Sequence, residues 1–311
     1  MPSLKAVRKR IGSVKNTQKI TRAMKMVAGA RLSRAQARIT ALRPYAVKTG
    51  DMLRNVANAA ILDKEDKEAS AEAVSVPLHP LLVVRPEKRV LYIVLSSDRG
   101  LCGAFNANVS RAAERAWKEK EAEGATVSFA TVGRKARDYL ARRKATIAID
   151  FPGMADGLDL AKVKTLSDWI VPRLRGDNAE FDAIYVIYNE FKSAITQLTV
   201  TEALLPLKTK PSENEAAKSE ANALSSNFEY EPSRDILLDR LVPMYLDITL
   251  YRALLESQAS EFGARMSAMD AATRNAKEVI EKLTLVYNRA RQAGITKELV
   301  EIVSGAEALK E

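Results

Sequence analysis

The sequence predicts an α/β protein with a long antiparallel α-helical coiled coil, formed by the N- and C-terminal helices, and a central three-layer Rossmann-like α/β domain. Apolar residues recur at steps of three and four near both ends, and strand and helix patterns alternate in the middle. Glycine (13) and proline (11) are scarce among 311 residues, which favours long helices over a barrel or sandwich. The expected divisions are an N-terminal coiled-coil helix (1–60), a linker (61–87), the α/β domain (88–208), a second linker (209–232) and a C-terminal coiled-coil helix (233–311).

The N-terminal residues predict one long helix, which Ser3 can cap and which continues to about Ala60. At roughly 55 residues and 1.5 Å per residue it is about 80 Å long. No compact domain covers that length, so another helix must lie beside it. Ile20, Met24 and Val27 are expected to shift sideways at a local break in register. The seam is expected at Leu4, Val7, Ile11, Val14, Gln18, Thr21, Ala28, Leu32, Ala35, Ile39, Leu42 and Ala46.

The C-terminal segment supplies the partner helix. Its seam residues are small or thin, which favours the close approach of two helices. Pro243 is expected to kink this helix or to mark its start, because proline removes a hydrogen bond and clashes with the preceding turn. Two long helices at opposite ends of a chain can pair as an antiparallel hairpin. The seven-residue repeat runs through Met266, Met269, Thr273, Ala276, Ile280, Leu283, Tyr287 and Ala290.

Strands and helices alternate between residues 88 and 208. This βαβαβ order implies a mostly parallel sheet between two helical layers, and the short link Lys192–Ala194 predicts an antiparallel hairpin at its end. Pro172 strains the last expected helix. Strands are expected at 89–97, 126–133, 146–151, 181–191 and 195–207, and helices at 106–124, 134–143 and 160–174.

The positive charge is concentrated at the N-terminus. Residues 1–54 hold fourteen Lys and Arg and one acid, Asp51, whereas the rest of the chain holds 35 basic and 38 acidic residues. A solvated surface helix mixes both signs, so this basic arm indicates an anionic partner. The two polar linkers are rich in Glu, Lys, Ser and Ala, which is typical of mobile segments.

The sequence offers little for catalysis. One cysteine, Cys102, excludes an internal disulfide and a multi-cysteine zinc site, and one histidine, His79, lies between two prolines. The turn SSDRGLCGAFN (96–106) carries neither a dinucleotide-binding nor a P-loop fingerprint. No apolar run is long enough to span a membrane, and the N-terminus has no secretory h-region. The chain is therefore not expected to be an enzyme on its own.

Two other function classes stay open on the residues alone. The basic arm suits a nucleic-acid-binding protein with a coiled-coil arm, although no aromatic platforms are interleaved with its cations. An α/β enzyme with a helical dimerisation arm is the other class, and the missing catalytic constellation disfavours it.

Three stretches resemble the gamma subunit, the central rotor shaft, of the rotary F-type ATP synthases of bacteria. They are SVKNTQKITRAMKMVAGARL (13–32), SSDRGLCGAFN preceded by HPLL (79–82), and YNRARQAGITKELVEIVSGAEAL (287–309). The resemblance covers nearly the whole chain. The two linkers are long for a bacterial member, Pro172 and Pro243 are unusual, and a lone Cys102 excludes the regulatory dithiol of plastid relatives.

The resemblance implies a non-catalytic rotor. The helix pair would stand inside a ring of alternating alpha and beta subunits, and the α/β domain would rest on the membrane proteolipid ring and meet the epsilon subunit. Proton flow, or sodium ion flow, would turn the shaft, with one copy in each complex. The chain would bind no cofactor, because ATP, ADP and Mg belong to the partner subunits, and it would bind no nucleic acid. Its place would be peripheral, on the cytoplasmic face of the bacterial inner membrane.

Residue roles follow from the same resemblance. The basic arm and Met24 would face acidic loops of the surrounding subunits, and the C-terminal tip would sit in an apolar sleeve, unless its apolar residues serve ordinary coiled-coil packing. The foot that meets the ring and epsilon would include Asp98, Arg99, Gly100, Leu101, Cys102 and Gly103. The expected rotor–stator contacts are Arg8, Lys9, Arg10, Lys19, Met24, Arg265, Thr273, Ile295, Leu299 and Ile302.

Overall fold

The computed structural model describes residues 3–68, 81, 85–174, 179–206, 231 and 234–308. The chain divides into two compact units. The helix-pair unit comprises Met1–Ala30 and Arg265–Glu311, and the sheet unit comprises Arg31–Ala264. His79 and most of the two expected linkers lie outside the described residues.

Two long helices contribute to both units. Helix α1 spans Leu4–Glu68 (65 residues) and α6 spans Arg234–Ala308 (75 residues). Helix α1 therefore ends at Glu68 and not near residue 60, so the first part of the expected linker 61–87 is helical. Residues 55–68 contain no glycine or proline and include three Ala, two Glu and two Lys, which favours continuation of the helix.

Both long helices contain a proline. Pro44 lies inside α1 and Pro243 inside α6. The expectation that Pro243 marks the start of its helix is wrong, because α6 begins at Arg234. Proline cannot donate to the carbonyl of residue 239, but Val242 and Leu246 on either side are fully buried. Tertiary packing here outweighs the local cost of the proline.

The sheet unit contains a five-stranded mixed sheet in the order β3-β2-β1-β4-β5. Strands β1 to β4 run parallel, and β5 pairs antiparallel with β4, which confirms the expected hairpin. Helix α4 stops before Pro172, and a 3₁₀ turn at Val171–Arg173 replaces its last expected turn. The elements are β1 (Arg89–Leu95), α2 (Phe105–Ala122), β2 (Thr126–Val132), α3 (Arg134–Ala141), β3 (Ile147–Phe151), α4 (Leu160–Ile170), β4 (Ala183–Phe191) and β5 (Gln197–Leu205).

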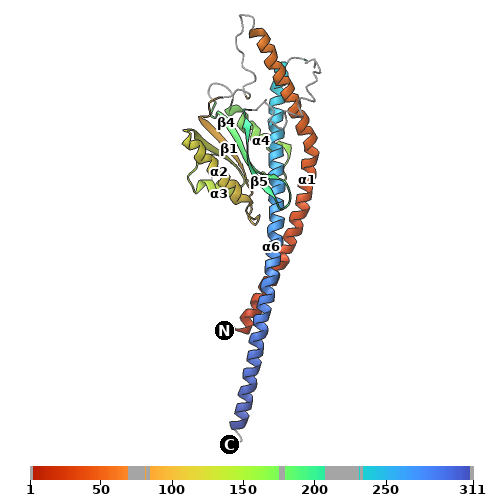
Figure 1. Cartoon of the computed structure of the whole chain (residues 1–311), viewed down its shortest axis with the longest axis vertical. Coiled ribbons are helices and arrows are strands. Elements are labelled where there is room, and N and C mark those ends of the chain that lie inside the picture. The colour runs from red at the N-terminus through yellow and green to blue at the C-terminus, as the bar shows by residue number, and fades with distance from the viewer. Residues whose placement is uncertain are drawn as a thin grey trace. The chain divides into compact units, whose positions relative to one another are not determined.

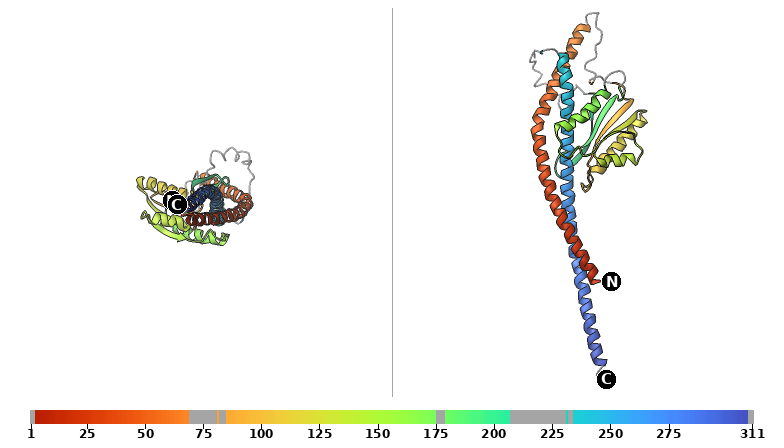
Figure 2. Two further views of the ribbon diagram at one scale, coloured as in Figure 1. Left: turned by 90° about the horizontal axis from the view of Figure 1, so that it is seen from below. Right: turned by 180° about the vertical axis from the view of Figure 1, so that it is seen from behind.

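Helices cover both faces of this sheet. Helices α2 and α3 pack on one face, and α4 packs with α6 on the other, as Figure 1 and the view from behind in Figure 2 show. The side chains of strand β1 point alternately to the two faces. Its Val90, Tyr92 and Val94 join the first cluster, and Leu91, Ile93 and Leu95 join the second.

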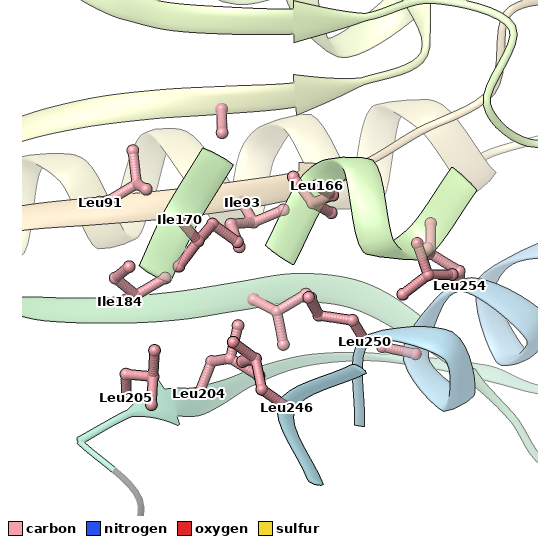
Figure 3. Close-up of a cluster of buried hydrophobic side chains, with 14 of the residues drawn as sticks. Leu91, Ile93, Leu166, Ile170, Ile184, Leu204, Leu205, Leu246, Leu250 and Leu254 are labelled. Atoms are coloured by element: carbon pink, nitrogen blue, oxygen red, sulfur yellow. The ribbon is translucent and has the colours of Figure 1, made fainter. Parts of the chain in front are cut away.

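The second cluster is the main core of the sheet unit. Figure 3 shows side chains from β1, β4, β5, α4 and α6 converging in it. Leu246 and Leu250 of α6 are 0% exposed there. Helix α6 is therefore a structural part of the sheet unit, because it fills one face of the sheet. The labelled members are Leu91, Ile93, Leu166, Ile170, Ile184, Leu204, Leu205, Leu246, Leu250 and Leu254.

Candidate functional site

The candidate surfaces of the helix-pair unit begin with the seam between α1 and α6. Thr21 pairs with Thr273, and Lys25 pairs with Asp270. A Cβ atom at Gly29 would lie 3.4 Å from Met266 Sδ. Residue numbers rise along α1 as they fall along α6, so the helices run antiparallel at these contacts. Small side chains and a glycine let the two backbones approach closely.

The burial pattern agrees with the predicted seam. Val7, Thr21 and Ala28 of α1 are buried, as are Met269 and Ala276 of α6. The predicted sideways shift is visible in Ile20 and Val27, which are exposed, whereas Met24 is half-buried. The remaining repeat positions of α6 are half-buried, namely Met266, Thr273, Ile280, Leu283, Tyr287 and Ala290.

A polar layer interrupts this seam. The hydroxyl oxygens of Thr21 and Thr273 lie 2.8 Å apart, and Thr273 Oγ1 also donates to the carbonyl of Met269. Next to them, Lys25 Nζ donates to Asp270 Oδ1, and Arg274 Nη1 donates to Asp270 Oδ2. The hydrogen bond from Lys25 lowers the pKa of Asp270, and the charge of Arg274 adds to this. Polar groups in a seam favour one register of the two helices.

The predicted rotor–stator contacts divide by exposure. Arg8, Lys9, Arg10 and Lys19 are exposed on α1. Met24, Arg265 and Thr273 are half-buried, and Thr273 is engaged in the polar layer. Thr273 therefore acts within the helix pair, and only part of its surface is accessible to another subunit.

The last turns of α6 carry apolar residues that the described part of the chain leaves exposed. Ile295, Leu299 and Ile302 are 51%, 57% and 70% exposed. The pairings listed above place Leu4, the start of α1, opposite residue 291, so α6 continues beyond its partner helix. The interpretation of these residues as ordinary coiled-coil packing is therefore wrong.

The second candidate surface is the turn after β1 in the sheet unit. Asp98 accepts hydrogen bonds from the backbone N–H groups of Arg134 (3.2 Å) and Gly153 (3.1 Å). The side chain of Asn106 accepts from the backbone N–H of Ser97 at 3.0 Å and donates to Cys102 Sγ at 3.1 Å. These bonds join the carboxyl ends of three parallel strands at one edge of the sheet.

The six predicted foot residues differ in burial. Asp98 is engaged inside the fold, and Cys102 is 2% exposed in a small cluster with Phe105 and Ala264. The expected contact of these two with another subunit is therefore not supported by their burial. Leu101 is 64% exposed and has a φ of 64°, a left-handed conformation. The other exposed members are Arg99, Gly100 and Gly103.

A neighbouring apolar residue escaped the sequence analysis. Ile195, in the tight link between β4 and β5, is 84% exposed. The link packs on α6, because a Cβ atom at Gly263 would lie 3.3 Å from Ala194 Cα. An isoleucine in a short hairpin link, where polar residues are the rule, was the available signal.

Two classes of site receive no support in the described part of the chain. No cluster of three or more His, Cys, Asp or Glu side chains there is arranged to hold a metal ion. Among the described helices, none combines the length and the apolar character that crossing a bilayer requires.

Comparison with known proteins identifies relatives over the full chain. A family model described as ATP synthase matches residues 3–309. The chain is 55% identical to the ATP synthase gamma chain of Sorangium cellulosum (strain So ce56) over a 326-residue alignment that covers 100% of both chains. It is 47% identical to the ATP synthase gamma chain of Anaeromyxobacter sp. (strain Fw109-5), again with 100% of both covered.

Solved structures show a similar fold. The rotor of the Euglena gracilis mitochondrial ATP synthase in rotational state 1 matches with a TM-score of 0.63 at 18% identity, covering 94% of this chain and 98% of that one. The central stalk and c-ring structure of the Tetrahymena thermophila mitochondrial ATP synthase matches with a TM-score of 0.56 at 22% identity, covering 81% and 99%. At these identities the likeness concerns the fold.

Proposed function

The chain belongs to the ATP synthase gamma-chain family as its non-catalytic central stalk subunit, and we propose that it couples ion-driven rotation to the catalytic sites of its neighbours. Proton flow through the proteolipid ring turns the stalk. The observation that carries the proposal is the apolar strip at the end of α6, which no part of α1 covers. An apolar surface that is exposed to water calls for a partner that encloses it.

The coupling rests on asymmetry. A single stalk presents different side chains to each of several equivalent alpha–beta pairs, so its contact energy with each pair differs. Those differences bias the sites toward different conformations, which is how rotation performs work. The chemistry and the bound ATP, ADP and Mg belong to the partner subunits, and one copy of this chain serves each complex.

The surface residues take the following roles in this proposal. The exposed cations of α1 steer and slide along acidic loops of the alpha and beta subunits, because each exposed ion pair contributes only about 0–1 kcal/mol. Met24 and Arg265 contact the same loops. Ile295, Leu299 and Ile302 fill the apolar sleeve, where burial of each side chain contributes about 1.5–3 kcal/mol.

We also propose that the sheet forms a three-layer Rossmann-like domain and that the long helices form a coiled coil. The order of the parallel strands and the helices on both faces support a three-layer Rossmann-like domain at 88–208, and the antiparallel contacts support a coiled coil. The chain after Glu68 and the segment 209–232 would link this domain to the two terminal helices, Leu4–Glu68 and Arg234–Ala308. The complex as a whole would attach the chain peripherally to the cytoplasmic face of the inner membrane.

Replacing Met24 tests the coupling role. Met24→Lys puts a second cation beside Lys25 on the surface that meets the stator. We expect ATP-driven ion pumping per ATP hydrolysed to fall well below wild type, while the free energy of unfolding falls by no more than about 1 kcal/mol, because Met24 is only half-buried. Pumping and hydrolysis are measured side by side on the purified complex, with Met26→Lys as the exposed control. Equal losses in pumping and hydrolysis, together with lower thermal stability, would contradict the role.

The exposed turn at Arg99, Gly100, Leu101 and Gly103 has two candidate partners. The resemblance points to the proteolipid ring and epsilon. A neighbour in the head, the ring of alpha and beta subunits, is the other candidate, because Cys102 of this turn packs against Ala264 of α6.

Cross-linking separates the two partners. A photo-reactive probe is attached to Leu101→Cys in a Cys102→Ser background and irradiated in the assembled complex, with Glu121→Cys on α2 as the control. Products with alpha or beta would support the head-side contact, and products with the proteolipid or epsilon would support the foot. The comparisons give no support to the nucleic-acid-binding alternative.

A further inference from the structure

The turn at 152–158 contacts both long helices within the sheet unit. Gln258 Nε2 of α6 donates to the carbonyl of Ala155 at 2.6 Å. Arg38 Nη1 of α1 donates to the carbonyl of Leu158 at 3.3 Å. The two donors come from helices more than two hundred residues apart in the chain, and their acceptors lie three residues apart in one turn.

The turn is itself held in place. Gly153 and Gly157 have φ angles of 75° and 63°, which the turn requires and which glycine adopts at little cost. Met154 and Leu158 are buried in the main core. From the sheet, Asp98 accepts the backbone N–H of Gly153. The two carbonyls are therefore presented by a segment that is anchored both to the core and to the carboxyl edge of the sheet.

Apolar packing and hydrogen bonds resist different motions. The leucine-rich contacts of α6 with the sheet favour burial but have no preferred direction, so they resist separation better than sliding. A hydrogen bond weakens steeply when its angle or distance changes. Donors on both helices that bind one anchored turn therefore resist rotation of each helix about its own axis.

We propose that the turn at 152–158 is a clamp that transmits torque from the sheet unit to both long helices, with Arg38 and Gln258 as its positioning residues. The proposal rests on the rotary function proposed above. It assigns Arg38, although this residue is an exposed cation of α1, to mechanical transmission, because its guanidinium donates to the turn of its own chain. Lys162 of α4 also donates to the turn, at the carbonyl of Asp156, and this bond joins the turn to α4 and not to a long helix.

A measurement of torsional stiffness in the assembled complex tests the clamp. The complex is fixed through its alpha and beta subunits, and a bead is attached to Glu121→Cys, an exposed position on α2. While the motor waits for ATP, the angular variance of the bead reports the compliance between the sheet unit and the helices. If the two bonds act as parallel springs that supply about half of the total torsional stiffness, Arg38→Ala with Gln258→Ala should raise the variance on the order of twofold, and each single variant should raise it less.

Two variants separate transmission from folding. Arg38→Lys keeps a donor and is expected to restore part of the stiffness, and Lys162→Ala is expected to leave the variance at the wild-type value. Unchanged variance in the double variant, or an equal rise in Lys162→Ala, would overturn the clamp. If the double variant does not assemble, Arg38→Ala and Gln258→Ala alone decide in the same way. A wild-type complex whose bead never rotates with ATP would instead overturn the rotary function.

Discussion

The two units of this chain bury their apolar residues in different ways. In the sheet unit, side chains from strands and helices form a core in which Leu246, Leu250 and Leu254 of α6 are almost fully buried. In the helix-pair unit, the same α6 exposes Leu285 and Leu299. One helix thus serves as a core element over part of its length and as a free surface over another part.

The ion pairs of the two units are about equally exposed, so the difference between the units lies in their apolar contacts. Arg252 and Glu202 of the sheet unit are 34% and 37% exposed. In the sheet unit, Glu202 accepts from both Arg252 and the hydroxyl of Tyr188, and burial raises the pKa of Tyr188. In the helix-pair unit, Lys25 and Asp270 are 44% and 30% exposed. The comparison indicates that the sheet unit buries its apolar core within this chain, whereas the helix-pair unit leaves large apolar residues exposed.

The largest effect is expected from a cavity in the sheet unit. Leu250→Ala removes a fully buried side chain and should lower the free energy of unfolding by about 2–5 kcal/mol. Urea denaturation is followed by tryptophan fluorescence, since Trp169 packs against the same cluster. The control on the same helix is Leu285→Ala. Leu285 is 71% exposed, so its replacement should change the free energy of unfolding by about 0.5 kcal/mol or less. Similar losses in both variants would remove the distinction between the two units.

An intermediate effect is expected at the free end of α6. Leu299→Ser should leave the stability of the isolated chain within about 0.5 kcal/mol, because the side chain is 57% exposed. In the complex it should weaken binding to the alpha–beta ring by about 1.5–3 kcal/mol, or roughly tenfold to a hundredfold. Binding is measured by titrating the labelled chain onto the ring, with the neighbouring Glu298→Ser as the control. A loss of stability without a loss of affinity would show that Leu299 packs within the chain.

The smallest effect is expected from the ion pair of the helix-pair unit. Lys25 lowers the pKa of Asp270, so the pair stabilises the folded state above the ordinary carboxyl pKa of about 3.9. That contribution is lost as the pH falls through the lowered pKa. We expect Asp270→Asn to reduce thermal stability slightly at pH 7 and to match wild type near pH 2. Thermal melts followed by circular dichroism at the two pH values measure this difference.

A matched control exists for this pair. Glu281→Gln removes an exposed ion pair with Lys277 that lies within α6 alone. It should leave the melts unchanged at both pH values, since such pairs contribute little. An equal effect of the two substitutions would show that Asp270 does not act between the helices.

The sequence predicted most of the fold because its patterns are local. Strand β1 is a continuous apolar run, as expected for a strand buried on both faces, and its predicted bounds differ from the observed ones by two residues. The seam of the helix pair followed from the heptad spacing. The end of α1 was placed too early, since no proline or glycine marks it.

The candidate surfaces were less predictable because they depend on distant contacts. Asp98 was expected to face another subunit, but its partners lie 36 and 55 residues further along the chain. The exposure of Ile295, Leu299 and Ile302 depends on where a helix almost three hundred residues away begins. Apolar periodicity alone does not distinguish a strip covered by its own chain from one that awaits a partner.

The burial of Cys102 gives this protein an internal reporter. It is the sole thiol of the 311-residue chain, and Phe105, Asn106 and Ala264 enclose it. A thiol reagent reaches it only when this edge of the sheet opens, so the rate of alkylation under native conditions follows the free energy of that local opening. The wild-type protein, without any introduced cysteine, can thus report the free energy of opening between α6 and the sheet while the motor turns.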